Sequence, residues 1–240
     1  MRDHYADIYA HHADEYEQLI SRENYTGNLL ATLQKITPLE GLDVIDMGAG
    51  TGRLVRILAP FARAVRAFDA SAAMLAVAAA RLKASGAHNW QVAVADHRAL
   101  PAQSRSADLV ISGWSICYTV VWEEDWQTEL DKALSEMERV ARPGGTLVIL
   151  ETLGTGFETP TPPQTMQKYF AHLDTTGFSS TWIRTDYRFA SIEEARELTT
   201  FFFQADMTDQ LISREPAILP ECTGIWYKQG KNSLADLVRE

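Results

Sequence analysis

The sequence predicts an α/β protein with a doubly wound sheet of about seven strands, most of them parallel. Two observations predict this fold. Short apolar runs alternate five times with helix-like segments between residues 42 and 151, as in a parallel sheet that helices cover on both faces. Three glycines follow the first apolar run directly, in D-M-G-A-G-T-G at 46–52. Right-handed crossovers then place the carboxyl ends of the parallel strands at one edge of the sheet.

The first predicted element is a helix over residues 3–20. Aromatic side chains recur along it at steps of four, three and four, at Tyr5, Tyr9, His12 and Tyr16. A helix outside the core must bury so much aromatic surface somewhere. We therefore expect residues 1–35 to form a helical lid over the open edge of the sheet, with Tyr16 reaching the bound ligand.

The core is expected over residues 41–151. Its strands are short apolar runs bounded by turn residues, at 42–46, 64–69, 90–95, 108–112 and 146–151. Its helices have apolar residues at helical spacing, at 52–59, 72–84 and 125–141. Pro60 ends the first helix, Ser71 is a suitable N-cap for the second, and Gly86 follows the end of the second.

The segment after the core has a different pattern. Residues 181–189 alternate between polar and apolar, as in a strand with one solvated face. Ser191 opens a capping-box sequence, which predicts a helix to about Ile212. A last strand is expected over 222–228. Residues 152–240 are thus predicted to extend the sheet in mixed direction and to cover the substrate, within a single domain over 1–240.

Composition limits the class of protein. The chain has 240 residues, 46% of them hydrophobic, which is enough for a full core. A net charge of −10 disfavours nucleic acids, because Lys and Arg supply non-specific affinity for phosphates. The two cysteines, Cys117 and Cys222, form no disulfide or metal-binding pattern. With no apolar segment of signal-peptide or membrane-spanning length, we expect a cytoplasmic protein.

The glycine loop at 46–52 narrows the choice of ligand. A strand, a glycine-rich loop and a helix together direct backbone N–H groups at whatever lies above the sheet. A P-loop ends in Gly-Lys-Ser/Thr, but here Arg53 and Leu54 follow Gly52. The dinucleotide pattern G-x-G-x-x-G, counted from Gly48, requires a glycine where this chain has Arg53. Neither phosphate-binding motif is present.

The loop instead resembles the first motif, D-x-G-x-G-x-G, of class I S-adenosylmethionine-dependent methyltransferases of the small-molecule type, similar to the methyltransferase-11 and -25 groups. Other motifs resemble the same family in the same order. They are F-D-A-S-A-A-M-L at 68–75, D-L-V-I-S-G-W-S at 108–115 and R-V-A-R-P-G-G-T-L-V-I at 139–149. The repeat Y-A-H-H-A-D-E-Y-E at 9–17 resembles the segment before the core in many small-molecule members. The resemblance covers about residues 9–151. It implies a Rossmann-like fold and S-adenosylmethionine as cofactor.

The resemblance also implies roles for particular residues. Asp69 would accept hydrogen bonds from both ribose hydroxyls, and Met74 would lie against the adenine. Asp96 would meet the adenine amino group, a role that His97 could share. The cofactor-binding residues expected in this way are Tyr16, Asp46, Gly48, Ala49, Gly50, Thr51, Gly52, Asp69, Ala70, Met74, Asp96, His97, Gly113 and Trp114.

The implied reaction is in-line displacement at the sulfonium methyl by an O, N, S or C atom of a small-molecule acceptor. Orientation and exclusion of water would be the main contributions of the protein. A general base is optional, and the sequence does not choose among His97, Tyr118 and His172. Trp114 and Tyr118 follow the fourth strand, where they either pack in the core or form an aromatic wall for the sulfonium.

Other functions stay open at this point. Aminopropyl transfer from decarboxylated S-adenosylmethionine would need paired acids after the fourth strand, where the chain has G-W-S-I-C-Y at 113–118. A catalytically silent cofactor-binding subunit is the alternative that is not an enzyme. No metal site is expected, because His11 and His12 lack partners at metal-ligand spacing. Three consecutive phenylalanines at 201–203 cannot all face one core, so a homodimer is also considered.

Overall fold

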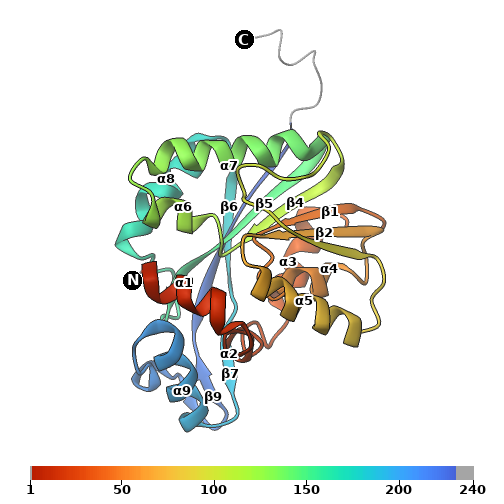
Figure 1. The fold of residues 1–240 in the computed structure, drawn as a ribbon. Helices are drawn as coiled ribbons and strands as arrows, with labels where there is room; N and C mark the ends of the chain where they lie inside the picture. Colours follow the sequence, from red (N-terminus) through yellow and green to blue (C-terminus); the bar gives the residue numbers. More distant parts are fainter. Residues whose placement is uncertain (1, 231–240) are drawn as a thin grey trace.

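A computed structural model describes residues 2–230 (Figure 1). Its centre is a seven-stranded sheet in the order β3-β2-β1-β4-β5-β10-β6. The parallel strands are β1 (Asp43–Met47), β2 (Ala64–Asp69), β3 (Trp90–Val94), β4 (Ala107–Gly113) and β5 (Ala141–Thr155). β10 (Glu221–Gln229) runs antiparallel to β5 and to β6 (Ser179–Arg184). The predicted doubly wound, mostly parallel sheet is confirmed.

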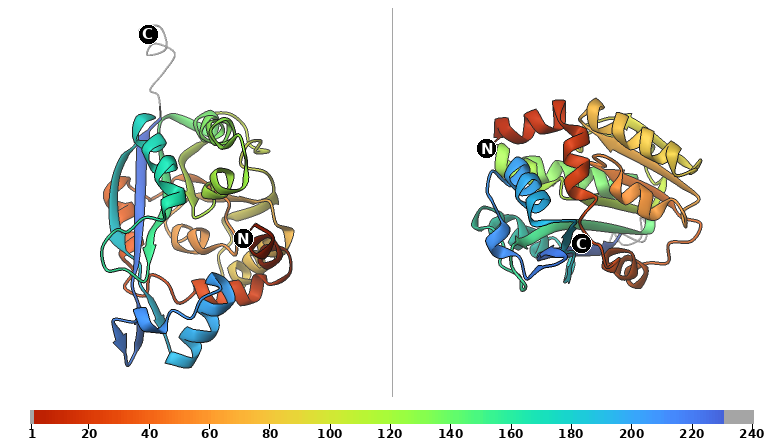
Figure 2. Two further views of the ribbon diagram at one scale, coloured as in Figure 1. Left: turned by 90° about the vertical axis from the view of Figure 1, so that its left-hand side faces the viewer. Right: turned by 90° about the horizontal axis from the view of Figure 1, so that it is seen from below.

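Helices cover both faces of this sheet (Figure 2). On one face lie α3 (Asn28–Ile36), α4 (Arg53–Leu58) and α5 (Ala72–Ala84), and on the other α6 (Cys117–Trp122), α7 (Trp126–Val140) and α8 (Gln167–Thr175). Successive strand residues point to opposite faces, so Val44 packs with the first set and Ile45 with the second. This double burial explains the apolar runs in the sequence.

The unit from β2 to α5 matches its prediction, strand and helix alike. The side chain of Ser71 accepts a hydrogen bond from Met74 N at 3.2 Å, which confirms it as the N-cap of α5. α4 begins after Gly52, whose φ of +83° lies in the left-handed region. A Cβ on Gly52 would lie 3.1 Å from the Cβ of Ala78, so glycine lets the two helices approach closely.

The helix predicted over residues 3–20 is two helices, α1 (Arg2–His11) and α2 (Ala13–Ile20). The break falls at His12, whose φ of −127° and ψ of 36° are not helical. α1 packs against α5, and α2 packs against both α5 and α9 (Ile192–Phe203) (Figure 2). The break at His12 therefore lets the second half of the predicted lid reach α9 while both halves stay on α5.

The single strand predicted over 181–189 is wrong, because the chain changes sheets there. β6 ends at Arg184, and β7 (Tyr187–Phe189) belongs to a second, antiparallel sheet, in the order β7-β9-β8. Its other strands are β8 (Ser213–Arg214) and β9 (Ala217–Leu219). Alternating polarity identifies a strand with one buried face, but it does not show which sheet the strand joins.

The last predicted helix starts where expected but is shorter. α9 ends at Phe203, because Gln204 adopts a left-handed conformation with a φ of 56°. Asp206 then accepts hydrogen bonds from the backbone N–H and the hydroxyl of Thr208, which forms a turn before Ile212. The helices α3, α6 and α8 were not predicted. α6 in particular lies in a short apolar run, for which periodicity does not separate helix from strand.

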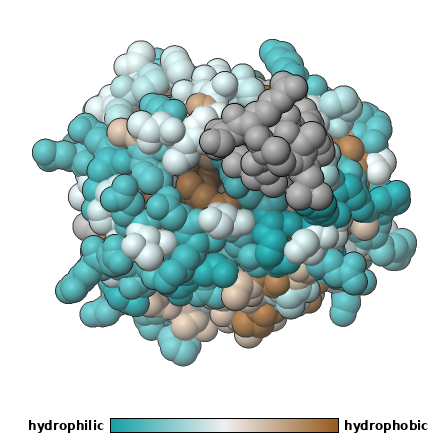
Figure 3. Space-filling view, turned by 90° about the horizontal axis from the view of Figure 1, so that it is seen from above, coloured by the Kyte–Doolittle hydropathy of each residue, from teal (hydrophilic) through white to brown (hydrophobic). Residues whose placement is uncertain are grey.

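The outer face of α7 is polar. Glu129, Lys132 and Glu138 lie on it, and the lysine pairs with Glu129 at 2.6 Å. Seen from above, the face over which α7 runs is mostly hydrophilic, with small hydrophobic areas (Figure 3). Among residues 2–230, no helix is both long enough and apolar enough to cross a bilayer.

Candidate active site

A cavity of about 620 Å³ opens at the carboxyl ends of the parallel strands. This edge of a doubly wound sheet is the usual place for a ligand, and the volume suits a small-molecule site. The cavity is lined by most of the residues predicted to bind cofactor: Tyr16, Gly48, Ala49, Gly50, Thr51, Asp69, Ala70, Met74, Asp96, His97, Gly113 and Trp114. The fold thus brings together residues from the ends of four strands and the loops that follow them, from α2 and from α5, while their contacts with a cofactor stay a prediction.

Two of the predicted cofactor residues do not line the cavity. Asp46 is fully buried beneath the glycine loop, and its carboxylate has no hydrogen-bond partner among the described residues. Burial raises the pKa of Asp46 to about 8. Gly52 lies against α5 instead of the cavity. Both residues lie on the side of the loop that faces away from the cavity, so we no longer expect them to contact a ligand directly.

His172 is not near the cavity, so it is removed from the candidate general bases. It lies on α8, where its Nε2 is 2.7 Å from Asp131 Oδ1 and its ring packs edge-on against Trp126. The sequence contained no information on which side of the sheet this helix would cover. His97 and Tyr118 both line the cavity and stay as candidates.

The glycine loop is held by the end of β2. The backbone N–H groups of Gly48 and Ala49 donate to the carbonyl oxygen of Phe68 at 2.7 and 2.9 Å. Gly48 has a φ of +75°, and a Cβ built on it would lie 1.8 Å from Ser115 Oγ. The segment that follows β4 comes so close to the loop at Ser115 that only glycine fits at position 48.

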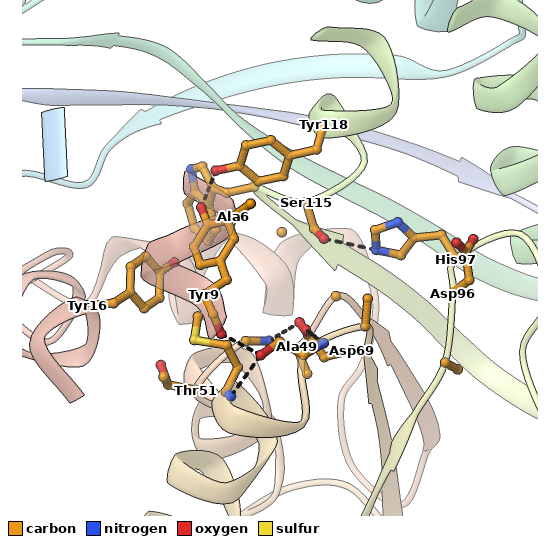
Figure 4. Close-up of a pocket in the computed structure, with 18 of the residues that line it drawn as sticks. Ala6, Tyr9, Tyr16, Ala49, Thr51, Asp69, Asp96, His97, Ser115 and Tyr118 are labelled. Carbon is orange, nitrogen blue, oxygen red and sulfur yellow. Dashed lines mark hydrogen bonds between the residues drawn. The ribbon is translucent and has the colours of Figure 1, made fainter. Parts of the chain in front are cut away.

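Asp69 lies at the end of β2 and joins the loop to α5 (Figure 4). Its Oδ2 accepts from Gly50 N, and its Oδ1 from Ser71 N, each at 2.8 Å. Burial raises the pKa of Asp69, while these two hydrogen bonds act in the opposite direction. Each carboxylate oxygen has a second lone pair, so the side chain can still accept hydrogen bonds from a ligand in the cavity.

His97 and Ser115 form a second polar pair in the cavity, with His97 Nε2 2.9 Å from Ser115 Oγ (Figure 4). Burial lowers the pKa of His97, so its imidazole is neutral near pH 7. The neighbouring Asp96 is held by Arg98 at 2.7 Å, which lowers the pKa of that carboxyl. A neutral imidazole beside a hydroxyl can accept a proton from an acceptor that reaches it.

Aromatic rings close the cavity on the side of α1, α2 and α6. The hydroxyls of Tyr9 and Tyr118 hydrogen-bond to each other across these elements (Figure 4). The ring of Tyr16 lies 5.5 Å from Tyr9, and that of Trp122 lies 4.4 Å from Tyr118, between centroids. Tyr9, Ser115 and Trp122 were not among the predicted site residues. Tyr9 belongs to the aromatic stripe of the first helix, which was the available signal.

Two buried acidic residues, Glu17 and Glu23, connect α2 and the segment after it to the core through ion pairs. Glu17 on α2 accepts a hydrogen bond from the hydroxyl of Thr51 and pairs with Arg56 and Arg81 at 3.1 and 2.9 Å. Glu23, just after α2, pairs with Arg53. These ion pairs join the α2 segment to the glycine loop, α4 and α5.

Glu151 holds the start of α6, the helix that carries the aromatic residues Tyr118 and Trp122. Its Oε1 accepts from Cys117 N at 3.1 Å, in the first turn of α6, and from the Tyr169 hydroxyl at 3.2 Å. The side chain is buried in β5, and burial raises the pKa of Glu151 to about 8. The position of Tyr118 and Trp122 on α6 therefore depends on a carboxyl group in the central sheet.

Glu151→Gln is expected to make stability less dependent on pH. Because the pKa of Glu151 is raised to about 8, the folded protein holds a proton that the unfolded chain releases above its ordinary value near 4.5. The wild type therefore loses stability as pH rises between these values. Glutamine imitates the protonated acid, so the variant should gain on the order of 1–3 kcal/mol relative to wild type between pH 5 and 8.

Urea unfolding at pH 5 and pH 8 measures this difference. Glu40→Gln, at an exposed position, is the matched control and should follow the wild type at both pH values. If the free energy of unfolding differs between the Glu151 variant and wild type by the same amount at both pH values, Glu151 has the same pKa in the folded and the unfolded protein.

Comparison with known proteins agrees with this geometry. Residues 45–149 match the family model described as a methyltransferase domain. The chain is 34% identical over 144 residues to the malonyl-[acyl-carrier protein] O-methyltransferase of Salmonella typhimurium, covering 60% of this chain and 51% of the relative. It is 34% identical over 143 residues to a ubiquinone/menaquinone biosynthesis C-methyltransferase of Hahella chejuensis, covering 58% of this chain and 52% of the relative. These matches span about half the length of both relatives.

A solved structure supports the fold over most of the chain. Phosphoethanolamine N-methyltransferase 2 of Haemonchus contortus, solved in complex with phosphomonomethylethanolamine and S-adenosylhomocysteine, superimposes with a TM-score of 0.59 at 19% identity. The superposition covers 92% of this chain and 57% of that protein. Sequence motifs, the family match and the sheet order all agree, so residues 45–149 match a methyltransferase domain, and this part of the chain is similar to class I, S-adenosylmethionine-dependent methyltransferases.

Proposed function

We propose that this protein transfers the methyl group of S-adenosylmethionine to a small-molecule acceptor. The observation that carries the proposal is the single cavity in which the glycine loop, Asp69, Asp96 and the end of β4 meet beneath an aromatic cover. The two curated relatives are named as methyltransferases, and the solved relative was crystallised with S-adenosylhomocysteine, which supports the same cofactor here.

The residues present fit this cofactor. Gly50 lines the cavity, and the nearest side-chain atom to a Cβ built on it would be Met74 Cε, at 3.7 Å, so a ligand can approach the backbone of the loop there. Asp69 presents carboxylate oxygens to the cavity, as hydroxyls of a ribose require. Asp96 and Met74 also line the cavity, where both can contact an adenine as the resemblance implies.

When bound, S-adenosylmethionine supplies an activated methyl group, which an acceptor atom takes in line while the sulfur keeps the electron pair. The chain orients the acceptor and excludes water, which is the larger part of catalysis for such a transfer. Burial keeps the Tyr118 hydroxyl protonated, because it raises the pKa of that phenol well above its ordinary value. Tyr118 can thus donate a hydrogen bond, whereas the neutral His97 can receive a proton through Ser115.

Calorimetry with S-adenosylmethionine, S-adenosylhomocysteine and NAD tests the assignment of the cofactor. We expect the two sulfur ligands to bind and NAD to give no heat. Incubation with S-adenosylmethionine and a mixture of acceptors should then release S-adenosylhomocysteine. Tight binding of NAD without binding of S-adenosylhomocysteine would refute the proposal. Binding without turnover on any acceptor would favour a silent cofactor-binding subunit, and release of methylthioadenosine from the decarboxylated cofactor would indicate aminopropyl transfer.

The proposal extends to the whole chain as a single methyltransferase domain, with a lid over 1–35, a core over 41–151 and an extension over 152–240. Met1 and residues 231–240 lie outside the described residues. We also propose that the acceptor is not a nucleic acid, because the net charge is −10. A reducing cytoplasm is the proposed location, since the two cysteines are both free. A homodimer stays a prediction.

We expect only the first half of the lid to move. Among the described residues, α1 is joined to the body by hydrogen bonds without an ion pair, such as His4 to Phe202 O at 3.0 Å and Arg2 to Trp122 O at 3.2 Å. α2 is fixed in addition by the ion pairs of Glu17. If ligands enter past α1, its amides should exchange quickly without ligand and become protected with S-adenosylhomocysteine.

Hydrogen exchange followed by mass spectrometry gives the measurement, with α2 as the internal control. Amides of Ala13–Ile20 should be protected in both states. Strong protection of Arg2–His11 without ligand would mean that α1 is a fixed part of the core, and that the cavity opens elsewhere.

A further inference from the structure

We propose that the methyl acceptor is a small aromatic molecule that carries no negative charge, packed against the aromatic cover that the tyrosines of the lid and the aromatic side chains of α6 together form over the cavity. This inference rests on the proposed methyl transfer. It concerns the part of the cavity that the predicted cofactor residues of β1, β2 and β3 leave free. That part is lined by Tyr9 and Tyr16 on one side and by Tyr118, Thr119, Trp122 and Glu123 on the other.

The aromatic rings in this part lie at steep angles to one another. Tyr118 and Trp122 are 4.4 Å apart with 32° between their planes. Tyr9 lies at 71° to Tyr118 and at 89° to Tyr16, at 5.6 and 5.5 Å. These rings contact one another, so a flat acceptor ring cannot pass between them. It can pack against the surface that they turn toward the cavity, stacking on one ring and meeting the edge of the next, which is the preferred geometry of aromatic groups. The hydroxyls of Tyr9 and Tyr118 bond each other where the lid contacts α6, and their remaining hydrogen-bonding capacity can serve a hydroxyl or amine of the acceptor.

The cationic side chains that line the cavity are already paired. Arg53 pairs with Glu23, and its guanidinium lies 3.6 Å from the centre of the Trp114 ring. Arg98 pairs with Asp96 at 2.6 Å and also with Glu129. A carboxylate or phosphate on the acceptor would have to compete with these acids for its usual partner.

The start of α6 does not offer an anion site either. A helix N-terminus attracts anions through its free N–H groups, but here the N–H of Cys117 already donates to Glu151 at 3.1 Å. An acid of the protein itself therefore occupies the position where an anionic acceptor would bind. This contact lies behind Tyr118, on the side of the central sheet.

Near Trp122 the cavity is lined by an acidic side chain, Glu123. No ion pair joins it to any other residue that the structure describes. Arg2 lies outside the lining, where it donates to Trp122 O at 3.2 Å and packs over the Trp122 ring. An acceptor with its own negative charge would be repelled by Glu123, whereas a neutral or cationic one would not.

Three phenols of similar size test the proposal on the full chain loaded with S-adenosylhomocysteine. They are 4-ethylphenol, which is neutral, tyramine, which is a cation, and 4-hydroxyphenylacetate, which is an anion. Calorimetry should show binding of the first two and binding about tenfold weaker for the acid, as expected for one unscreened repulsion near a protein surface. Trp122→Leu should weaken the binding of all three, because it removes one aromatic wall.

Glu123→Gln should reduce the disadvantage of the acid, whereas Glu124→Gln, at an exposed neighbouring position, should leave it unchanged. Binding of the acid at least as tightly as the other two would overturn the inference. Loss of such binding in Arg2→Ala would then identify Arg2 as an anion site. Failure of all three phenols to bind a protein that does bind S-adenosylhomocysteine would also overturn it. Failure to bind S-adenosylhomocysteine would instead refute the proposed function.

Discussion

Replacing Asp69 with asparagine is expected to weaken the binding of S-adenosylhomocysteine about ten- to a hundredfold. The carboxylate lines the cavity, and it is the group placed to accept hydrogen bonds from two ribose hydroxyls. Charge-assisted hydrogen bonds of this kind contribute roughly 1.5–3 kcal/mol. The amide nitrogen of asparagine would also face an N–H group, because Asp69 accepts from both Gly50 N and Ser71 N. Some loss of stability should therefore accompany the loss of affinity.

Calorimetry measures the dissociation constant, and thermal unfolding without ligand measures the loss of stability. Asp43→Asn is the matched control. Asp43 lies at the opposite end of β1 and is also held on two sides, by Arg63 and by Arg142 at 2.6 Å. That variant should lose stability and keep its affinity for S-adenosylhomocysteine. An unchanged dissociation constant for the Asp69 variant would show that its carboxylate serves only to hold the loop.

Gly48→Ala is expected to reduce cofactor affinity by about a hundredfold or more, since the new methyl group cannot be accommodated without moving the site. Its Cβ would lie 1.8 Å from Ser115 Oγ and 2.7 Å from His97 Nε2. The glycine loop and the segment after β4 would have to separate. The φ of +75° adds roughly 1–2 kcal/mol of backbone strain for a residue with a side chain.

Gly41→Ala is the control that distinguishes steric crowding by the new methyl group from backbone strain. Gly41 has nearly the same φ, +73°, but nothing lies within 4 Å of where its Cβ would be. Both variants should lose stability through strain, and only Gly48→Ala should lose binding of S-adenosylhomocysteine. Equal affinities in the two variants would contradict the close approach of Ser115 to the loop.

The order of strands and helices in the core could be predicted because its signals are local. Ser71 caps α5 through Met74, three residues away, and the glycine loop follows β1 directly. The breaks could not be predicted in the same way. α1 and α2 separate at His12, where the chain turns so that α2 packs on α9 as well as on α5, and β6 and β7 separate because they join different sheets. Each break depends on partners distant in the sequence.

The residues of the candidate site also differ in whether a local motif or only tertiary packing places them. Residues near a recognisable motif, such as Gly48, Asp69 and Asp96, lie in the cavity, since a parallel sheet brings the ends of its strands to one edge. Asp46 is part of the same motif but is fully buried, because it still belongs to β1 and helices cover both faces of that strand. His172 carries no motif at all, and only the packing of α8 decides that it lies beside Asp131.

The sequence by itself determined the resemblance to class I methyltransferases, the parallel core and the strand ends at which the cavity opens. These follow from periodicity and from glycines at positions where the backbone must turn, and both are properties of neighbouring residues. Only the tertiary structure decided what closes the cavity. Tyr9 meets Tyr118 across 109 positions of the chain, and Glu17 meets Arg81 between the lid and α5. Such contacts depend on how whole helices pack, because burial of their apolar faces fixes where side chains distant in the sequence come together.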